Sequence, residues 1–157
     1  VLGARPMATF TYPSGAFFRV WQPLSHIGAE LITEPGALVW NELNTRDVDG
    51  CKAFYSAVFG WQPEPGPRGD YTMFKLDGKT VAGMIDMDPI HIPKEVPPYW
   101  AVYIGVEDAD AAAAKTTELG GGVIVPPFDV PVGRMAVLND PVGAPISIVA
   151  MTGSMSD

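Results

Sequence analysis

The order of strand and helix patterns between Ala37 and Met151 limits most strongly how this chain can fold. A stretch with alternating apolar residues, typical of a strand, precedes a stretch with apolar residues at helical spacing, and further strand patterns follow. The same order begins again at Tyr99, and an aspartate that can cap a helix, Asp47 or Asp108, stands before each helical stretch. We therefore predict an α+β fold of two paired strand–helix–strand modules, with helices on one sheet face and the other face curled inward.

A shorter repeat links the two ends of the chain. Residues 7–20 and 135–148 align without a gap, and both contain Met-Ala followed by Pro-x-Gly-Ala. Each segment predicts a β-hairpin with a Pro-x-Gly turn. In the second hairpin we expect Asp140 to accept backbone hydrogen bonds and to have no catalytic role. The predicted division is a terminal hairpin of a preceding, truncated copy of the domain (1–22), a linker (23–36), a complete domain (37–152) and a tail (153–157).

The predicted N-terminal hairpin carries large apolar side chains on both faces, namely Phe10, Phe17, Phe18, Val20 and Trp21. An isolated two-stranded ribbon is marginally stable in water, and its open edge invites pairing. The hairpin must therefore dock either on its own domain or on a second chain. We predict the second arrangement, a homodimer with two-fold symmetry.

Composition excludes several classes of partner. The formal net charge is −8 and no cluster of Lys and Arg occurs, so nucleic acid and anionic membranes are not expected partners. No apolar run approaches the roughly 18 residues that span a bilayer. Cys51 is the only cysteine, which excludes an internal disulfide and a cysteine-rich zinc site. We interpret it as a helix-packed thiol of a reduced, cytoplasmic protein.

Two motifs resemble those of a known family. The helix motif Phe54-Tyr-x-x-Val-Phe-Gly-Trp61 and the turn motif Asp140-Pro-x-Gly143 are similar to marks of the vicinal-oxygen-chelate superfamily of glyoxalases, bleomycin-resistance proteins and dioxygenases. The match runs from Ala37 to about Met151 and implies paired βαβββ modules that form a curled, incomplete-barrel sheet around a cavity. Flanking segments resemble, more specifically, two-domain glyoxalase-like proteins of actinobacteria: Trp21-Gln22, His26-Ile-Gly-Ala29 and Gly36-x-x-x-Trp40-Asn-Glu-Leu43.

The resemblance also shows where metal ligands would stand. Metal enzymes of the family carry one ligand on each of four strands, and these positions fall on Trp40, Ala101, Ser147 and the region Gly83 to Ile85. Indole, methyl and aliphatic groups do not bind a divalent cation, and one serine hydroxyl is a poor ligand. Glu42 would be recruited only by a two-residue shift, and one carboxylate does not make a site. We predict no metal and no other cofactor.

The remaining inner sheet face suits a small organic molecule. Aromatic walls with a few polar groups are typical of ligand sites, although the same aromatics can simply fill a closed cavity. Glu42 separates these readings, because an acid is not expected in a dry core unless Arg134 or Lys75 neutralises it. His91 lies in a proline-flanked loop, either as a lid residue or as a solvated one. The candidate ligand-binding residues are Trp40, Glu42, Asn44, Tyr103, Ser147 and His91.

Three functions remain open at this stage, because this fold hosts unrelated activities. The favoured one is a metal-free protein that binds an aromatic or amphipathic small molecule. The alternative is a glyoxalase- or hydroxylase-type enzyme that uses Glu42 as acid and base, or one that needs an absent partner domain. The third is a structural surface protein without a ligand. Whether the chain is an enzyme stays undecided.

Overall fold

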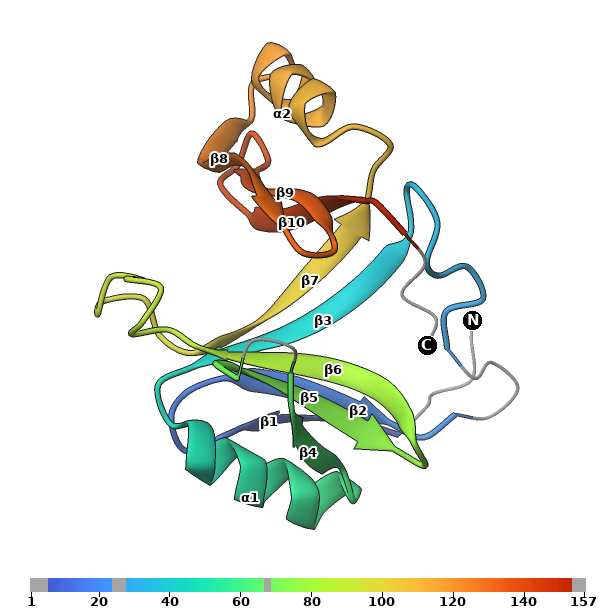
Figure 1. The fold of residues 1–157 in the computed structure, drawn as a ribbon, viewed down its shortest axis with the longest axis vertical. Coiled ribbons are helices and arrows are strands. Elements are labelled where there is room, and N and C mark those ends of the chain that lie inside the picture. Colours follow the sequence, from blue (N-terminus) through green and yellow to red (C-terminus); the bar gives the residue numbers. More distant parts are fainter. Residues whose placement is uncertain (1–5, 24–27, 67–68, 154–157) are drawn as a thin grey trace. The chain divides into compact units, whose positions relative to one another are not determined.

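The computed structural model describes residues 6–23, 28–66 and 69–153 (Figure 1). The chain separates into two compact units, one of residues 1–28 and 41–100 and the other of residues 29–40 and 101–157. The elements are β1 (Met7–Thr11), β2 (Phe17–Trp21), β3 (Leu38–Thr45), α1 (Val48–Phe59), β4 (Gln62–Pro65), β5 (Tyr71–Leu76), β6 (Lys79–Asp86), β7 (Tyr99–Gly105), α2 (Ala109–Glu118), β8 (Gly122–Val130), β9 (Gly133–Asn139) and β10 (Pro145–Met151).

The order βαβββ occurs twice, first as β3-α1-β4-β5-β6 and then as β7-α2-β8-β9-β10. In both modules the first strand pairs in parallel with the last one, β3 with β6 and β7 with β10. The other pairs are antiparallel, which gives the orders β4-β5-β6-β3 and β8-β9-β10-β7. The predicted α+β class with paired βαβββ modules is confirmed.

Helix α1 begins after the aspartate cap that the sequence predicts, and a glycine ends it. The carboxylate of Asp47 accepts a hydrogen bond from the backbone N–H of Gly50, at 3.1 Å, and so satisfies one unpaired donor of the first turn. Gly60 ends the helix in the left-handed region, with φ of 70°. Asp108 caps α2 in the same manner, through the N–H of Ala111.

The core of the first unit is an aromatic cluster around Tyr55, which is fully buried. Its ring packs against Phe74, Trp61 and Trp100, and the indole N–H of Trp100 donates a hydrogen bond to its hydroxyl at 3.0 Å. Cys51 is buried in the same core, and this burial raises the pKa of its thiol. The thiol is therefore helix-packed, as predicted, and poorly suited to act as a nucleophile.

The N-terminal hairpin has the same strand register as the hairpin β9–β10. The pair Met7 and Trp21 corresponds to the pair Met135 and Val149, and the following pairs keep the same order up to the turn. The predicted repeat of two hairpins is therefore present in the structure. That the first hairpin derives from a preceding copy of the domain stays a prediction.

The two turns also share their hydrogen bonds. The N–H of Gly15 donates to the carbonyl of Tyr12, and the N–H of Gly143 donates to the carbonyl of Asp140. Both glycines have positive φ, which residues with a side chain rarely adopt. The carboxylate of Asp140 accepts the N–H groups of Val142 and Ala144, so it is a turn residue, as predicted.

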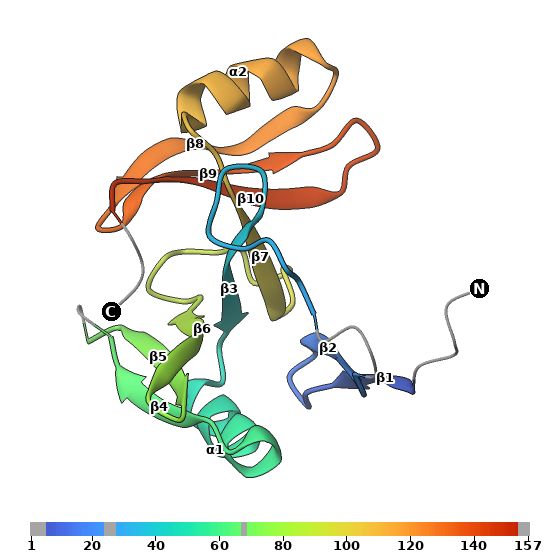
Figure 2. The ribbon, with the colours of Figure 1, turned by 90° about the vertical axis from the view of Figure 1, so that its right-hand side faces the viewer.

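One face of the N-terminal hairpin packs on its own helix α1 (Figure 2). The ring of Phe18 contacts the rings of Phe54 and Phe59, and the hydroxyl of Tyr12 donates to the carboxylate of Asp47 at 2.6 Å. This face of the hairpin therefore docks on its own domain. The sequence analysis did not favour this alternative. The opposite face keeps Met7 and Phe17 largely exposed, at 66% and 69%.

Replacement of Tyr12 by phenylalanine tests how much the hairpin docking stabilises the first unit. The hydrogen bond to a charged carboxylate is lost, so we expect the free energy of unfolding to fall by about 1.5–3 kcal/mol. Urea denaturation followed by tryptophan fluorescence measures this change. The matched control is Tyr99→Phe, since Tyr99 is partly exposed. Equal stability of Tyr12→Phe and the parent chain would show that the contact contributes nothing.

The homodimer remains a prediction and concerns the exposed hairpin face. Burial of two large apolar side chains per chain favours association by about 1.5–3 kcal/mol for each side chain. Equilibrium sedimentation should give the mass of a dimer, and the double variant Met7→Ser, Phe17→Ser should shift it to the monomer. The control is Val142→Ser, because Val142 is highly exposed in the other hairpin. A parent chain that stays monomeric at the highest concentrations tested contradicts the prediction.

Candidate functional site

The six residues predicted from the sequence divide evenly between the two units. Glu42, Asn44 and His91 belong to the first unit, which contains β3 from Asn41 onward. Trp40, Tyr103 and Ser147 belong to the second unit. Each set has its own geometry within its unit.

The three residues of the second unit lie in one neighbourhood. Tyr103 on β7 is the register partner of Ser147 on β10, and both side chains are buried. Trp40 packs on the small cluster that Tyr103 forms with Ala101 and Val149. The expected grouping of two aromatic rings with a hydroxyl is thus present, while its role in binding stays a prediction.

Glu42 in the first unit is held by a phenol that the sequence analysis did not single out. The hydroxyl of Tyr71, on β5, donates a hydrogen bond to Oε2 of Glu42 at 2.8 Å. Glu42 is half-buried, and a hydrogen bond of this kind compensates for the water that its carboxylate has lost.

Gly83 makes room for this phenol. It is the register partner of Glu42 in the parallel pair of β3 and β6. A Cβ atom built on Gly83 would collide with the hydroxyl of Tyr71. A side chain at this position would therefore require the tyrosine hydroxyl to move.

A second phenol lies within electrostatic reach of Glu42. Tyr99 is the first residue of β7, and 37% of its surface is exposed. Burial of the rest of the ring raises the pKa of Tyr99, and the negative charge of Glu42 raises it further.

The two cations proposed as ion-pair partners of Glu42 bind other carboxylates. Lys75 contacts Glu64 on the neighbouring strand β4, with 2.6 Å between Nζ and Oε2. Arg134 contacts Asp110 and Asp129, and its hydrogen bond to Asp110 lowers the pKa of that carboxyl. Lys75 and Arg134 therefore do not act as the ion-pair partners of Glu42.

Asn44 lies two residues after Glu42 on β3, on the same strand face, and is buried. Within the described part of the chain, its side-chain Nδ2 has no hydrogen-bond partner. A buried amide without a partner costs about 1–3 kcal/mol, which makes Asn44 a donor that a ligand or a water molecule can satisfy.

His91 lies in an exposed turn between β6 and β7, with φ of 59°. Arg46 fixes this segment, because its guanidinium donates to the carbonyls of Ile92, Pro93 and Val96 and binds Asp88. The exposure matches the alternative of a solvated loop histidine. A lid role for His91 stays a prediction.

The described residues do not group into a metal site of the family type. Across residues 6–23, 28–66 and 69–153, no three side chains of His, Cys, Asp or Glu group closely enough to hold a metal ion. Gly83, at one of the family's ligand positions, has no side chain that could bind a metal ion.

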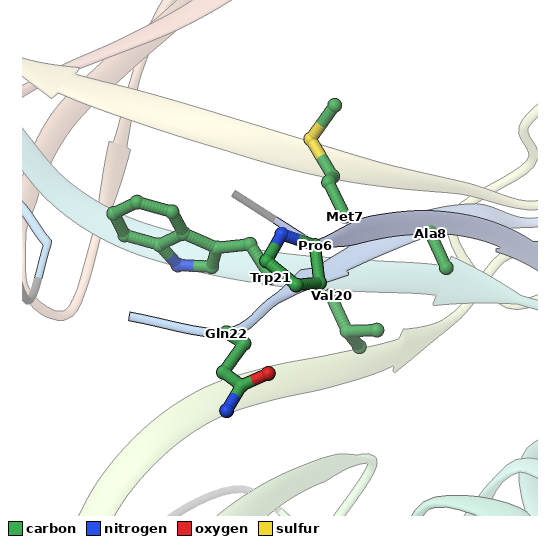
Figure 3. A pocket seen from close by; sticks show the side chains of 6 residues that line it. All are labelled: Pro6, Met7, Ala8, Val20, Trp21 and Gln22. Carbon is green, nitrogen blue, oxygen red and sulfur yellow. The ribbon is translucent and has the colours of Figure 1, made fainter. Parts of the chain in front are cut away.

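An open hollow of about 390 Å³ lies at the end of the N-terminal hairpin (Figure 3). Its walls are mostly apolar and carry no acid, base or nucleophile, so it offers packing and no chemistry. None of the predicted ligand-binding residues lines the hollow. The residues that line it are Pro6, Met7, Ala8, Val20, Trp21 and Gln22.

Neither α1 nor α2 has the length and apolarity to cross a membrane.

Comparison with solved structures places the fold. A methylmalonyl-CoA epimerase in complex with methylmalonyl-CoA and NH4+ is 20% identical, with a TM-score of 0.54, and the alignment covers 79% of this chain and 100% of that one. The Mn(II)-bound glyoxalase from Novosphingobium aromaticivorans is also 20% identical, with a TM-score of 0.52, over 78% of this chain and 42% of that one. At this identity the likeness concerns the fold alone.

Curated relatives are closer in sequence. The Mycobacterium tuberculosis protein named "Putative glyoxylase CFP32" is 45% identical over 147 residues, which are 91% of this chain and 55% of the relative. The anthracycline biosynthesis protein DauV of Streptomyces sp. strain C5 is 39% identical over 153 residues, which are 96% of this chain and 54% of the relative. The chain thus spans about half the length of the curated relatives that it matches.

A family model extends over most of the chain, from residue 24 to residue 148. This range contains both βαβββ modules apart from the last three residues of β10. Together with the curated relatives, the match shows that the chain belongs to the Glyoxalase/Bleomycin resistance protein/Dioxygenase superfamily.

Proposed function

We propose that this chain binds a small aromatic or amphipathic organic molecule and does so without a metal ion. The observation that carries the proposal is the Tyr71 phenol, which donates to Glu42 and takes the space above Gly83. A sheet face with a positioned carboxylate, and with glycine at a family ligand position, suits an organic ligand better than a cation. We propose the cytoplasm as the compartment, in keeping with a single, buried thiol.

The second unit adds support from its own aromatic residues. Trp40 and Tyr103 supply ring surface beside the hydroxyl of Ser147, and such surfaces combine apolar area with a polar contact. The names of the relatives, a glyoxylase and an anthracycline biosynthesis protein, both refer to the chemistry of small organic molecules. An aromatic ligand agrees with the second of these names.

Native mass spectrometry with a panel of small aromatic carbonyl compounds and amines tests the binding proposal. We expect at least one compound to remain bound to the chain and to be lost from the variant Trp40→Ala. The matched control is Trp21→Ala, which alters the hairpin hollow and should leave binding unchanged. Absence of any retained compound, or loss of binding in the control alone, would argue against the proposed site.

Metal analysis tests the second part of the proposal. The chain is first dialysed against a chelator and then incubated with zinc, nickel or iron before removal of free metal. We expect far less than one bound ion per chain, because the family's ligand positions carry side chains that do not bind divalent cations. Retention of about one ion per chain would overturn the metal-free proposal.

A second candidate function is catalysis, with Glu42 as acid and base. The hydrogen bond from Tyr71 favours it, because a fixed carboxylate is what proton transfer next to a carbonyl group requires. The reading also agrees with the name glyoxylase of the mycobacterial relative. In this case Glu42 would remove a proton from carbon, and the phenol of Tyr71 would hold the carboxylate in place.

Proton exchange measured by nuclear magnetic resonance in D₂O tests catalysis without a known substrate. If one of a panel of carbonyl compounds exchanges its α-hydrogen in the presence of the chain, Glu42→Gln should slow this exchange by about 10²–10⁴-fold. The control is Glu64→Gln, since Glu64 is an exposed carboxylate paired with Lys75. Unchanged exchange in Glu42→Gln would end this role for Glu42.

A further inference from the structure

Strand β1 forms one outer edge of the N-terminal hairpin. Within the described ranges of the chain, β1 and β2 pair only with each other, as a two-stranded sheet. All five residues of β1 are exposed, whereas two residues of β2 are half-buried. An outer strand of this kind presents a row of backbone N–H and C=O groups, with which a further strand can pair.

Two hydrogen bonds fix the pattern of the ladder between β1 and β2. The N–H of Tyr12 donates to the carbonyl of Ala16 at one end, and the N–H of Gln22 donates to the carbonyl of Pro6 at the other end, both at 2.9 Å. In an antiparallel ladder, opposite residues alternate between hydrogen-bonded and non-hydrogen-bonded pairs. The register runs between these two bonds without a bulge, so the type of every pair is determined.

Thr9 and Arg19, which lie opposite each other, form a non-hydrogen-bonded pair in this pattern. Their backbone N–H and C=O groups therefore point away from the hairpin, those of Thr9 on the edge of β1 and those of Arg19 on the edge of β2. The outer edge of β1 thus offers the backbone groups of three residues, namely Met7, Thr9 and Thr11.

The outermost strands of the two βαβββ modules are protected against further pairing, and β1 is not. β4 has only four residues, of which two are prolines and one is Glu64. β8 contains Pro126 and Pro127, and its register with β9 shifts twice. Proline, charge and irregular register are devices by which outer strands avoid pairing with other chains. β1, with the sequence Met-Ala-Thr-Phe-Thr, has none of them, while Arg19 places a charge on β2.

The second hairpin shows which neighbour such an edge accepts. β9 is the counterpart of β1 in the repeated hairpin, with Met135 in the place of Met7. Its outer edge pairs with β8 in antiparallel orientation. A copy of β1 that is related to the first by a two-fold axis in the sheet is also antiparallel to it. A second copy of the chain can therefore supply to β1 the kind of neighbour that β9 has.

We infer that two copies of the chain associate through the edges of their β1 strands, which gives a continuous four-stranded antiparallel sheet in the order β2-β1-β1-β2. This inference goes beyond the proposed function and does not depend on it. Thr9 lies opposite Thr9 of the second copy, and Met7 lies opposite Thr11. β1 carries no charge, so the pairing places no like charges opposite each other, although the net charge of −8 opposes association.

Proline substitutions on the two edges of the hairpin test the inference, because proline removes one backbone N–H. Thr9→Pro removes an outward N–H from β1, and Arg19→Pro removes one from β2. Both variants lose the hydrogen bond between the Arg19 and Thr9 side chains, so they are matched. In equilibrium sedimentation we expect Thr9→Pro to raise the dissociation constant of the dimer at least about tenfold, which corresponds to about 1.4 kcal/mol. Arg19→Pro should leave the constant within about twofold.

Hydrogen exchange in the unmodified chain tests the inference even if the proline variants do not fold. We expect the amides of Met7, Thr9 and Thr11 to exchange more slowly as the chain concentration rises, and those of Phe17 and Arg19 to keep their rates. A dimer whose β1 amides exchange at the monomer rate would mean that the copies meet through another surface, and the inference would be overturned. A chain that stays monomeric, or equal effects of Thr9→Pro and Arg19→Pro, would overturn it as well.

Discussion

The parallel pairing of the first and last strands within each module is the constraint on which the candidate site depends. Because β3 pairs with β6, Glu42 stands directly opposite Gly83. Because β5 pairs with the other edge of β6, the ring of Tyr71 reaches across Gly83 to the carboxylate of Glu42. A half-buried carboxylate without such a donor would be costly, so the pairing and the hydrogen bond support each other.

Features that depend on neighbours in the sequence could be predicted well. Asp47 and Gly60 bound α1 because caps act over three or four residues, and the Pro-x-Gly turns form the same hydrogen bonds in both hairpins. Tyr71 could not be assigned to Glu42 in the same way. Its position depends on the register of β5 and β6, which no local pattern in the sequence determines.

The ion pair of Lys75 shows again that local sequence patterns do not determine contacts between strands. The segment of Gln62 to Pro65 contains two prolines and did not suggest a strand, yet it forms β4 at the edge of its sheet, where proline is tolerated. This edge strand supplies Glu64, which binds Lys75. One face of the N-terminal hairpin docks within its own unit, an arrangement that the sequence analysis did not favour. The rings of Phe54 and Phe59 on α1 offer Phe18 an apolar surface there.

A crystal structure at high resolution tests the central claim most directly, because it shows the surroundings of Glu42. The account predicts the hydroxyl of Tyr71 about 2.8 Å from Oε2 of Glu42, above Gly83, with no metal ion at the carboxylate. A metal ion coordinated by Glu42, or a Tyr71 side chain turned away from Gly83, would contradict it.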